Sequence, residues 1–274
     1  MLPAINIFNV VLPLLYSAVF GFYALDFIKE KKQFKNFKRI VLFLTLIAHS
    51  LYLVFRTVEY NHTPITNKFE IFSIIACSIA FSYFILELFT DIRGTGAFIL
   101  LFALIFQIIS SLFVPDTYLV PEVLRDRLLG IHVISAILGY SGITISAVYG
   151  LLYIILYKNI KASRFGFFFE RLPNLEVLEK LSYNSSVIGF ILLTVAIFIG
   201  LIWLPSAFPD FSYYDPKLIG TIIVWLFYGM SLILKSSQRL LGKKLIYFIL
   251  ASYFIAIISL IVTNSLAKTF HSFY

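Results

Sequence analysis

The sequence predicts an all-α, polytopic membrane protein with eight transmembrane helices. Of its 274 residues, 60% are hydrophobic and 13% are charged, and the mean hydropathy is +0.94. Soluble domains carry about 25% charged residues, so the composition excludes that class. A bilayer core about 30 Å thick requires about 20 mainly apolar residues for each spanning helix. The chain offers eight such runs.

Short polar connections separate these runs. The first run lacks the preceding positive charge and the small-residue cleavage site of a secretory signal, so we interpret it as a helix. The fifth run exceeds the spanning requirement and is expected to tilt or to project from one surface. Because the longest polar segment is only about 158–185, a single integral membrane domain over 1–274 is predicted. The predicted spans are 5–27, 39–58, 69–89, 96–114, 128–157, 186–208, 217–234 and 245–267.

Lys and Arg are unevenly distributed between the two predicted sides. Sixteen of the 22 lie in the segments 29–39, 87–95, 158–185 and 235–244. The positive-inside rule places these segments in the cytoplasm, and therefore both termini outside it. The net charge of +8 then reflects topology and anionic lipid. No basic module with interleaved aromatic residues predicts nucleic-acid binding.

Residue types that carry hydrolytic or redox chemistry are sparse. Cys77 is the only cysteine, so the chain can form neither an internal disulfide nor a CxxC pair. The sequence contains no Gly-x-Ser-x-Gly, no HExxH and no phosphate-binding glycine loop. A conventional enzyme is therefore not expected.

The four histidines fall at informative depths. On the predicted topology His62, His132 and His271 lie on the external side, and His49 lies in the middle of the second span. His132 and His271 come from helices far apart in sequence and share one depth, which makes them a candidate ligand pair. Neutral imidazole binds iron or zinc through one nitrogen while an acceptor holds the other. The alternative for any one of them is an interfacial ring at headgroup level.

An aromatic cluster with an acid-Pro-Lys motif lies at the same predicted depth, in the connection before the seventh span. Pro216 suits the first turn of a helix, and Asp215 before it is a good N-cap. The aromatic residues supply surface that could cover a flat ligand, or an aromatic belt at the membrane interface. The cluster comprises Trp203, Phe208, Phe211, Tyr213, Tyr214, Asp215, Pro216 and Lys217.

Two intramembrane features require partners on other helices. A polar ring at the position of His49 is either a functional group, in haem transit or substrate binding, or a hydrogen-bonding tie between helices. Arg56 lies seven residues on, on a similar helix face. The fifth span carries small residues at close spacing, which indicates close helix packing. These are Gly139, Gly142, Ser146 and Gly150.

Four collinear segments resemble a known family. They are HTPITNKFEIFSIIA (62–76), LLGIHVISAILGYSGITISAVYGLLYIILY (128–157), GLIWLPSAFPDFSYYDPKLIGTIIVWLFYG (200–229) and FHSFY (270–274). Together they resemble the cytochrome c assembly proteins that handle haem, in the CcsA and HemX-like branch. That family carries a tryptophan-rich external loop ending in Trp-Asp-Pro-Lys-Glu, with an external histidine on each side.

The resemblance implies a cofactor and partners. His132 and His271 correspond to the axial ligands of haem b iron, and the loop 203–217 to the platform over the macrocycle. The function implied is cytochrome c biogenesis of the system II type, in which haem is held for attachment to apocytochrome c with a second assembly subunit, in the cytoplasmic (inner) membrane. Cations for the haem propionates would come from Arg56, Lys68, Arg125, Arg127, Lys217 and Lys268.

The chain also departs from the family pattern. The loop is poor in tryptophan, Leu218 replaces the acid, and Ile233 stands where the family has an intramembrane histidine. Such loops are closer to HemX-like members, which are associated with restraining the amount of glutamyl-tRNA reductase. A HemX-like regulator, acting through its cytoplasmic loops, is therefore the alternative. A solute transporter would predict an internal repeat, which the sequence does not show.

Overall fold

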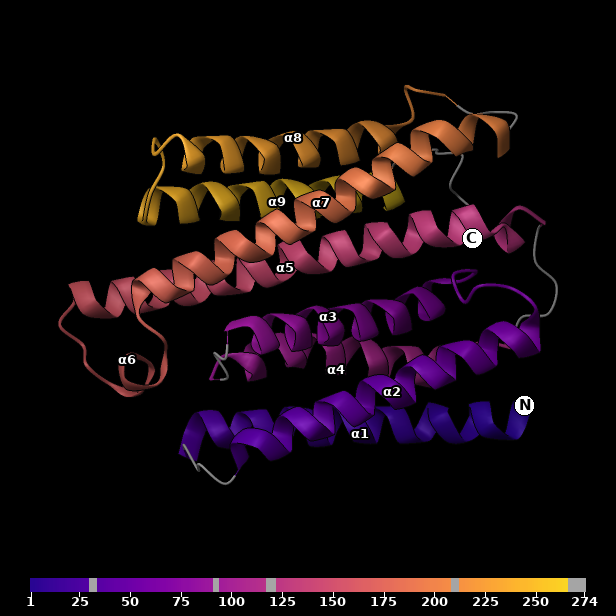
Figure 1. The fold of residues 1–274 in the computed structure, drawn as a ribbon, viewed down its shortest axis with the longest axis horizontal. Helices are drawn as coiled ribbons and strands as arrows, with labels where there is room; N and C mark the ends of the chain where they lie inside the picture. The colour runs from indigo at the N-terminus through magenta and orange to yellow at the C-terminus, as the bar shows by residue number, and fades with distance from the viewer. Residues whose placement is uncertain (30–33, 91–93, 117–121, 208–211, 266–274) are drawn as a thin grey trace. The chain divides into compact units, whose positions relative to one another are not determined.

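The computed structural model describes residues 1–29, 34–90, 94–116, 122–207 and 212–265. Within these ranges the chain is helical and contains no strand (Figure 1). Its elements are α1 (Leu2–Lys29), α2 (Phe34–Tyr60), α3 (Lys68–Thr90), α4 (Gly96–Phe113), the 3-10 helix η1 (Glu122–Arg125), α5 (Arg127–Lys161), α6 (Phe167–Arg171), α7 (Leu175–Ala207), α8 (Pro216–Ser236) and α9 (Lys243–Ser265).

The predicted fold class is confirmed, because eight of the described helices are long and apolar enough to cross a membrane. All except α6 and η1 belong to this set. The fifth, α5, has 35 residues and is about 52 Å long at 1.5 Å per residue, well above the thickness of a bilayer core. The direction in which the helices cross the membrane, and with it the location of the two termini, stays a prediction.

The sixth span begins earlier than predicted. It was expected from residue 186, whereas α7 begins at Leu175. Its first three turns bury Leu178, Leu181, Ser182 and Ser185, and they also carry the charged residues Glu176, Glu179 and Lys180. A run of this kind is amphipathic, so its average hydropathy is low although one face packs as tightly as a core helix.

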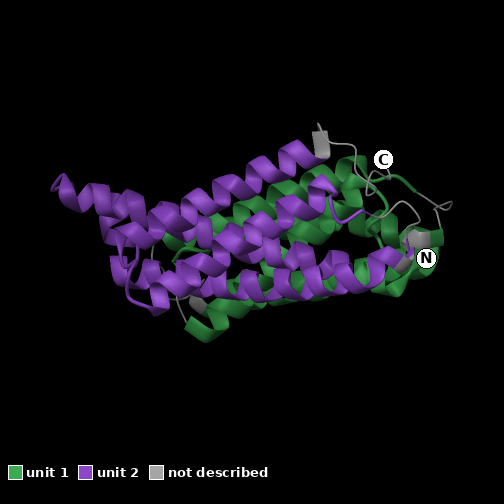
Figure 2. Ribbon diagram, turned by 90° about the horizontal axis from the view of Figure 1, so that it is seen from above, with its two compact units in different colours: residues 1–130 green, residues 131–274 purple. Residues whose placement is uncertain are grey.

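The chain divides into two compact units, residues 1–130 and 131–274 (Figure 2). The single membrane domain expected from the sequence stays a prediction. In the first unit α1 packs against α2 and α4, and α3 packs against α4. Its apolar core includes Ile5, Leu12, Tyr52 and Tyr60. In the second unit α8 packs against α7 and α9. The core of that unit comprises Ile143, Leu193, Val224, Tyr228, Leu245, Ile249 and Ala256.

Side-chain caps fix where several helices begin. Asn67 Oδ1 accepts the backbone N–H groups of Phe69 and Glu70 at the start of α3, at 3.0 and 2.9 Å. Asn174 Oδ1 accepts that of Val177 in α7, at 2.9 Å. These oxygens satisfy donors that have no partner within the helix.

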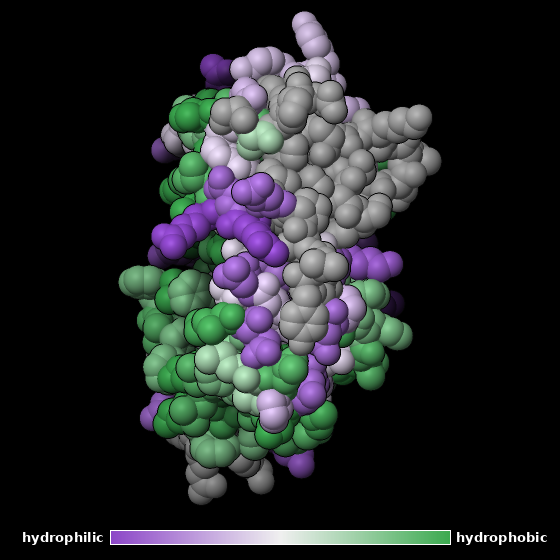
Figure 3. All heavy atoms as spheres, turned by 90° about the vertical axis from the view of Figure 1, so that its right-hand side faces the viewer, coloured by the Kyte–Doolittle hydropathy of each residue, from purple (hydrophilic) through white to green (hydrophobic). Residues whose placement is uncertain are grey.

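The surface matches the environment that these helices require. Many large apolar side chains are exposed, for example Val10 at 64% and Ile202 at 78%. In a bilayer such side chains face lipid rather than water. Figure 3 looks onto helix ends and shows hydrophilic residues gathered near the centre, with hydrophobic residues along the sides and below. The protein is therefore a multi-pass membrane protein in contact with a lipid bilayer.

Candidate functional site

The candidate site lies at the end of the second unit where α5 begins, α7 ends and α8 begins (Figure 1). Two of these helices, α5 and α7, are held together by a seam of small residues. An added Cβ on Gly142 would lie 2.9 Å from the Cα of Gly189, so no larger residue fits there. One turn further, Ser146 Oγ donates to the carbonyl of Ser182 at 2.6 Å, and Ser182 Oγ donates to that of Ser146 at 2.8 Å. The close packing predicted for this face of α5 is confirmed.

His132 lies at the other end of this seam. Its Nδ1 is 2.8 Å from the backbone oxygen of Ala196 on α7. A carbonyl oxygen only accepts, so Nδ1 carries the proton and donates it. In the neutral ring Nε2 then keeps its lone pair, and no hydrogen bond to it comes from the described residues. This is the arrangement of a metal-ligating histidine, in which an acceptor fixes the ring through the nitrogen that does not bind the metal.

Gly200 makes room for this ring. A Cβ added there would lie 2.9 Å from Cε1 of His132 and 3.2 Å from Nδ1. Gly200 is one turn beyond Ala196 on α7, so the carbonyl that orients the ring and the space that receives it are adjacent. Sequence reasoning identified His132 but missed Ala196 and Gly200. The spacing of small residues on α7 was the available signal.

The connection from α7 to α8 ends in the predicted cap. Asp215 is buried at 5% exposure, and its Oδ1 accepts the backbone N–H groups of Lys217 and Leu218 at 2.8 and 3.4 Å. Pro216 is the first residue of α8, where its missing N–H costs nothing. The cap predicted from the Asp-Pro pair is therefore confirmed.

The aromatic residues of this connection have unequal exposure. Trp203 is half-buried near the end of α7, whereas Tyr213 and Tyr214 are 62% and 86% exposed. The other predicted site residues, Phe208, Phe211 and His271, lie outside the described residues.

His49, in the first unit, is held through both ring nitrogens. Its Nδ1 lies 2.9 Å from Tyr16 Oη on α1, and its Nε2 lies 3.0 Å from Ser73 Oγ on α3. Ser73 Oγ in turn donates to Gln107 Oε1 on α4 at 3.3 Å. The ring is fully buried and ties four helices together. Helix–helix hydrogen bonding, one of the two predicted roles, therefore describes its contacts, and neither nitrogen is open to a ligand in this structure.

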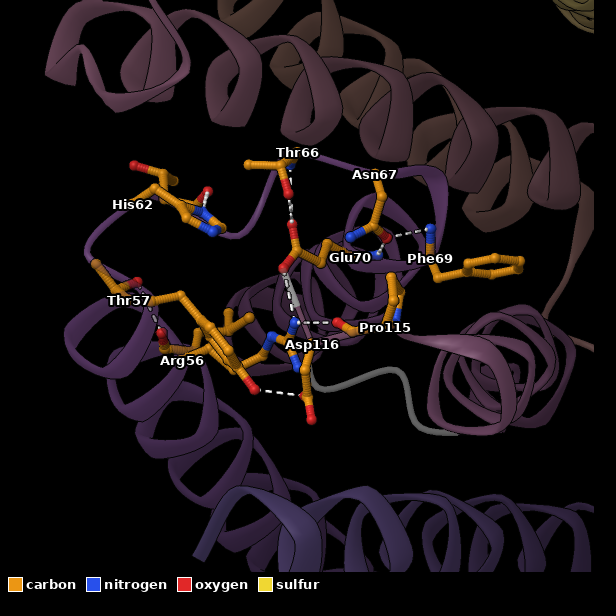
Figure 4. A network of polar contacts seen from close by, with 12 residues as sticks. Arg56, Thr57, His62, Thr66, Asn67, Phe69, Glu70, Pro115 and Asp116 are labelled. Atoms are coloured by element: carbon orange, nitrogen blue, oxygen red, sulfur yellow. Dashed lines mark hydrogen bonds and ion pairs between the residues drawn. The ribbon is translucent and has the colours of Figure 1, made fainter. Parts of the chain in front are cut away.

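Arg56 belongs to a second buried network in the same unit (Figure 4). Its Nη2 donates to Glu70 Oε1 at 2.8 Å and to the carbonyl of Pro115 at 3.0 Å. The other oxygen of Glu70 accepts the backbone N–H and hydroxyl of Thr66, both at 2.8 Å. The guanidinium also lies 4.7 Å from the ring centre of Tyr60. Arg56, a candidate partner of a propionate, is thus already paired with the carboxylate of Glu70. The sequence alone indicated no role for Glu70.

A metal site built from several acidic, histidine or cysteine side chains is absent from the described part of the chain.

Comparison with known proteins identifies the family of this chain. The family model described as cytochrome C assembly protein matches residues 5–271, nearly the whole chain. The chain belongs to this family. The resemblance found in the sequence is thereby confirmed.

Relatives within the cytochrome c assembly family carry two kinds of name. "Cytochrome c biogenesis protein CcsA" of Guillardia theta is 28% identical over 250 residues, covering 84% of this chain and 83% of the relative. The protein of the same name from Prochlorococcus marinus (strain MIT 9312) is 26% identical over 290 residues, covering 96% and 89%. "Protein HemX" of Brevibacillus brevis is 24% identical over 224 residues, covering 79% and 80%.

Proposed function

We propose that this member of the cytochrome c assembly family handles haem in cytochrome c biogenesis of the system II type. The observation that carries the proposal is the orientation of His132. The Ala196 carbonyl occupies Nδ1, and no described residue occupies Nε2, which would bind iron. Relatives named for cytochrome c biogenesis cover most of the chain, which supports the same reading.

The donor set suits haem rather than a bare metal ion. A haem iron already has four porphyrin nitrogens and needs only one or two axial imidazoles from the protein. Trp203 and the exposed Tyr213 and Tyr214 offer aromatic surface of the kind that covers an apolar ring. When bound, haem would supply the group that is joined to the cysteines of a c-type cytochrome.

The remaining parts of the site are proposals from the family resemblance. His271 would be the second axial ligand, and Phe208 and Phe211 would complete the aromatic platform. Lys217, two residues after the N-cap Asp215, would be the cation that pairs with a haem propionate. The partners would be apocytochrome c and a second membrane subunit, and the location the cytoplasmic membrane, with both termini and this site on its outer side.

The experiment that tests the site is an absorption spectrum of the protein purified from haem-replete membranes. The wild type is expected to show a low-spin haem spectrum that is lost in His132→Ala and in His271→Ala. His49→Ala is the matched control, because this ring has no nitrogen open to iron in the structure. A spectrum unaltered in His132→Ala would contradict the proposed ligand.

A second candidate function is regulation of tetrapyrrole synthesis, as in the HemX-like reading. The observations that favour it are the HemX relatives and a loop that holds few tryptophans. Deletion distinguishes the two functions. Loss of covalent c-type cytochromes supports assembly, whereas normal cytochromes with a raised amount of glutamyl-tRNA reductase support regulation.

A further inference from the structure

We propose that residues 158–171, at the opposite end of the second unit from His132, form a basic aromatic hairpin that binds the anionic headgroup layer of the surrounding bilayer. The hairpin joins α5 to α7 and contains α6, which has no buried residue. The inference is independent of haem.

Four phenylalanines of this hairpin are exposed. The exposed fractions are 59% for Phe165, 45% for Phe167, 39% for Phe168 and 37% for Phe169. The rings of Phe165 and Phe169 are 4.9 Å apart, and those of Phe167 and Phe168 are 5.8 Å apart. Four large aromatic side chains concentrated in one short exposed segment mark a contact surface, because isolated apolar residues need no explanation but a patch does.

The depth of the hairpin follows from its neighbours. Where α8 ends and α9 begins, Lys243 Nζ lies 5.0 Å from the ring centre of Tyr157, and Lys235 pairs with Glu179. Charged and tyrosine side chains of this kind mark the level of the headgroups. α5 continues for four residues beyond Tyr157, and α7 begins four residues before Glu179. Both distances are about 6 Å along a helix.

Lipid headgroups reach the hairpin at this depth. The polar layer of a bilayer adds about 5–8 Å on each side of the hydrocarbon core. The hairpin therefore starts and ends within that layer. Figure 1 shows α6 to one side of the end of α5 and the start of α7, joined to them by two connecting segments. Interfacial segments bury apolar side chains about 5–10 Å into the same boundary.

The charge of the hairpin selects the kind of lipid. Residues 158–171 contain Lys158, Lys161, Arg164 and Arg171 against the single acid Glu170. Each Lys or Arg near an anionic leaflet contributes about 1 kcal/mol of attraction. Exposed apolar residues also continue along α5 to Ile160, so apolar side chains that face lipid extend as far as the hairpin. The phenylalanine rings of the hairpin would contact acyl chains, and the Lys and Arg side chains beside them would contact anionic headgroups.

The test uses site-directed spin labels on the full chain in nanodiscs. Cys77→Ala removes the single cysteine, and Phe168→Cys then places one label on the hairpin. Ile155→Cys, on the exposed apolar side of α5, is the lipid control, and Ser237→Cys, an exposed residue two positions after Lys235, is the control for a water-accessible label at the level of the headgroups. Collision rates with oxygen and with a water-soluble nickel chelate are measured in phosphatidylcholine alone and with phosphatidylglycerol added.

With phosphatidylglycerol, the label at residue 168 is expected to resemble that at 155, with high oxygen and low nickel collision rates. Lys161→Gln with Arg164→Gln should lower the ratio of inserted to water-exposed hairpin about fivefold per charge. Nickel access equal to that at 237 in both lipids would overturn the proposal. Low collision rates with both reagents in both lipids would also overturn it, because they would indicate that protein covers the label. The proposal would fail as well if the label inserts to the same extent with and without phosphatidylglycerol, or with and without the two substitutions.

Discussion

Each unit carries a histidine inside a candidate membrane span, and the two rings are held in different ways. His49 in the first unit is fully buried with hydrogen bonds at both nitrogens, from α1 and α3. Among the described residues, His132 in the second unit is hydrogen-bonded at one nitrogen only, to a carbonyl on α7. The difference teaches that the chemistry of a histidine depends on how many of its nitrogens the fold has already used. Four predictions, two for each unit, are given from the largest expected effect to the smallest.

Breaking the Arg56–Glu70 pair should damage the first unit most. Glu70→Gln leaves the guanidinium buried at 2% exposure without its carboxylate. Removing one partner of a buried ion pair costs about 3–5 kcal/mol. The midpoint of thermal unfolding in detergent, followed by circular dichroism, is expected to fall strongly. Glu122→Gln, an exposed acid in the same unit, is the control and should leave the midpoint unchanged. Equal midpoints for the two variants would contradict a structural role for the pair.

Replacing His49 should cost stability and leave haem binding intact. His49→Leu removes the hydrogen-bond partner of the buried Tyr16 hydroxyl and one of the two hydrogen-bond partners of the Ser73 hydroxyl. An unsatisfied buried group costs about 1–3 kcal/mol. The unfolding midpoint should fall, while the haem spectrum of the folded fraction stays that of the wild type. Loss of the spectrum in a stably folded His49→Gln protein would reverse the comparison and make His49 a ligand.

The eight spans and the small-residue face of α5 were predictable because each depends on residues close together in the sequence. The same holds for the cap at Asp215, which needs only the next three residues. The partners of His49 were not predictable, since Tyr16 and Ser73 lie 33 and 24 residues away. The early start of α7 was missed because its charged face conceals the buried one. The free nitrogen of His132 depends on Ala196, 64 residues on.

Filling the space beside His132 sharpens the comparison within the second unit. Gly200→Ala places a methyl group 2.9 Å from the ring, which must then move away from the Ala196 carbonyl. Overpacking of this kind costs about 1–3 kcal/mol. Haem retention, measured by titration of the purified protein, is expected to weaken about tenfold, with a shift from low-spin toward high-spin absorption.

Gly166→Ala is the control for this variant, because an added Cβ there meets nothing within 4 Å. It should bind haem as the wild type does. If Gly200→Ala binds haem with unchanged affinity and spin state, the position of the ring does not govern the site.

The smallest effect is expected at the cap of α8. Asp215→Ala removes the oxygen that accepts the N–H groups of Lys217 and Leu218. Loss of an N-cap costs about 1 kcal/mol, whereas Asp215→Asn keeps an acceptor and should retain most of it. Unfolding midpoints of the three proteins should therefore follow the order wild type, Asn, Ala. An Ala variant as stable as the wild type would show that the cap is not needed to begin α8.

The seam between α5 and α7 permits a single alignment of the two helices. The reciprocal bonds of Ser146 and Ser182 and the contact of Gly142 with Gly189 form together at one register only. Gly189 also receives the side chain of Ile143, whose Cγ2 would lie 2.7 Å from an added Cβ, so a shifted alignment would lose this contact as well. The two helices are therefore held in one alignment. The distance from His132 to the opposite ends of α5 and α7 is then fixed by the number of residues between them.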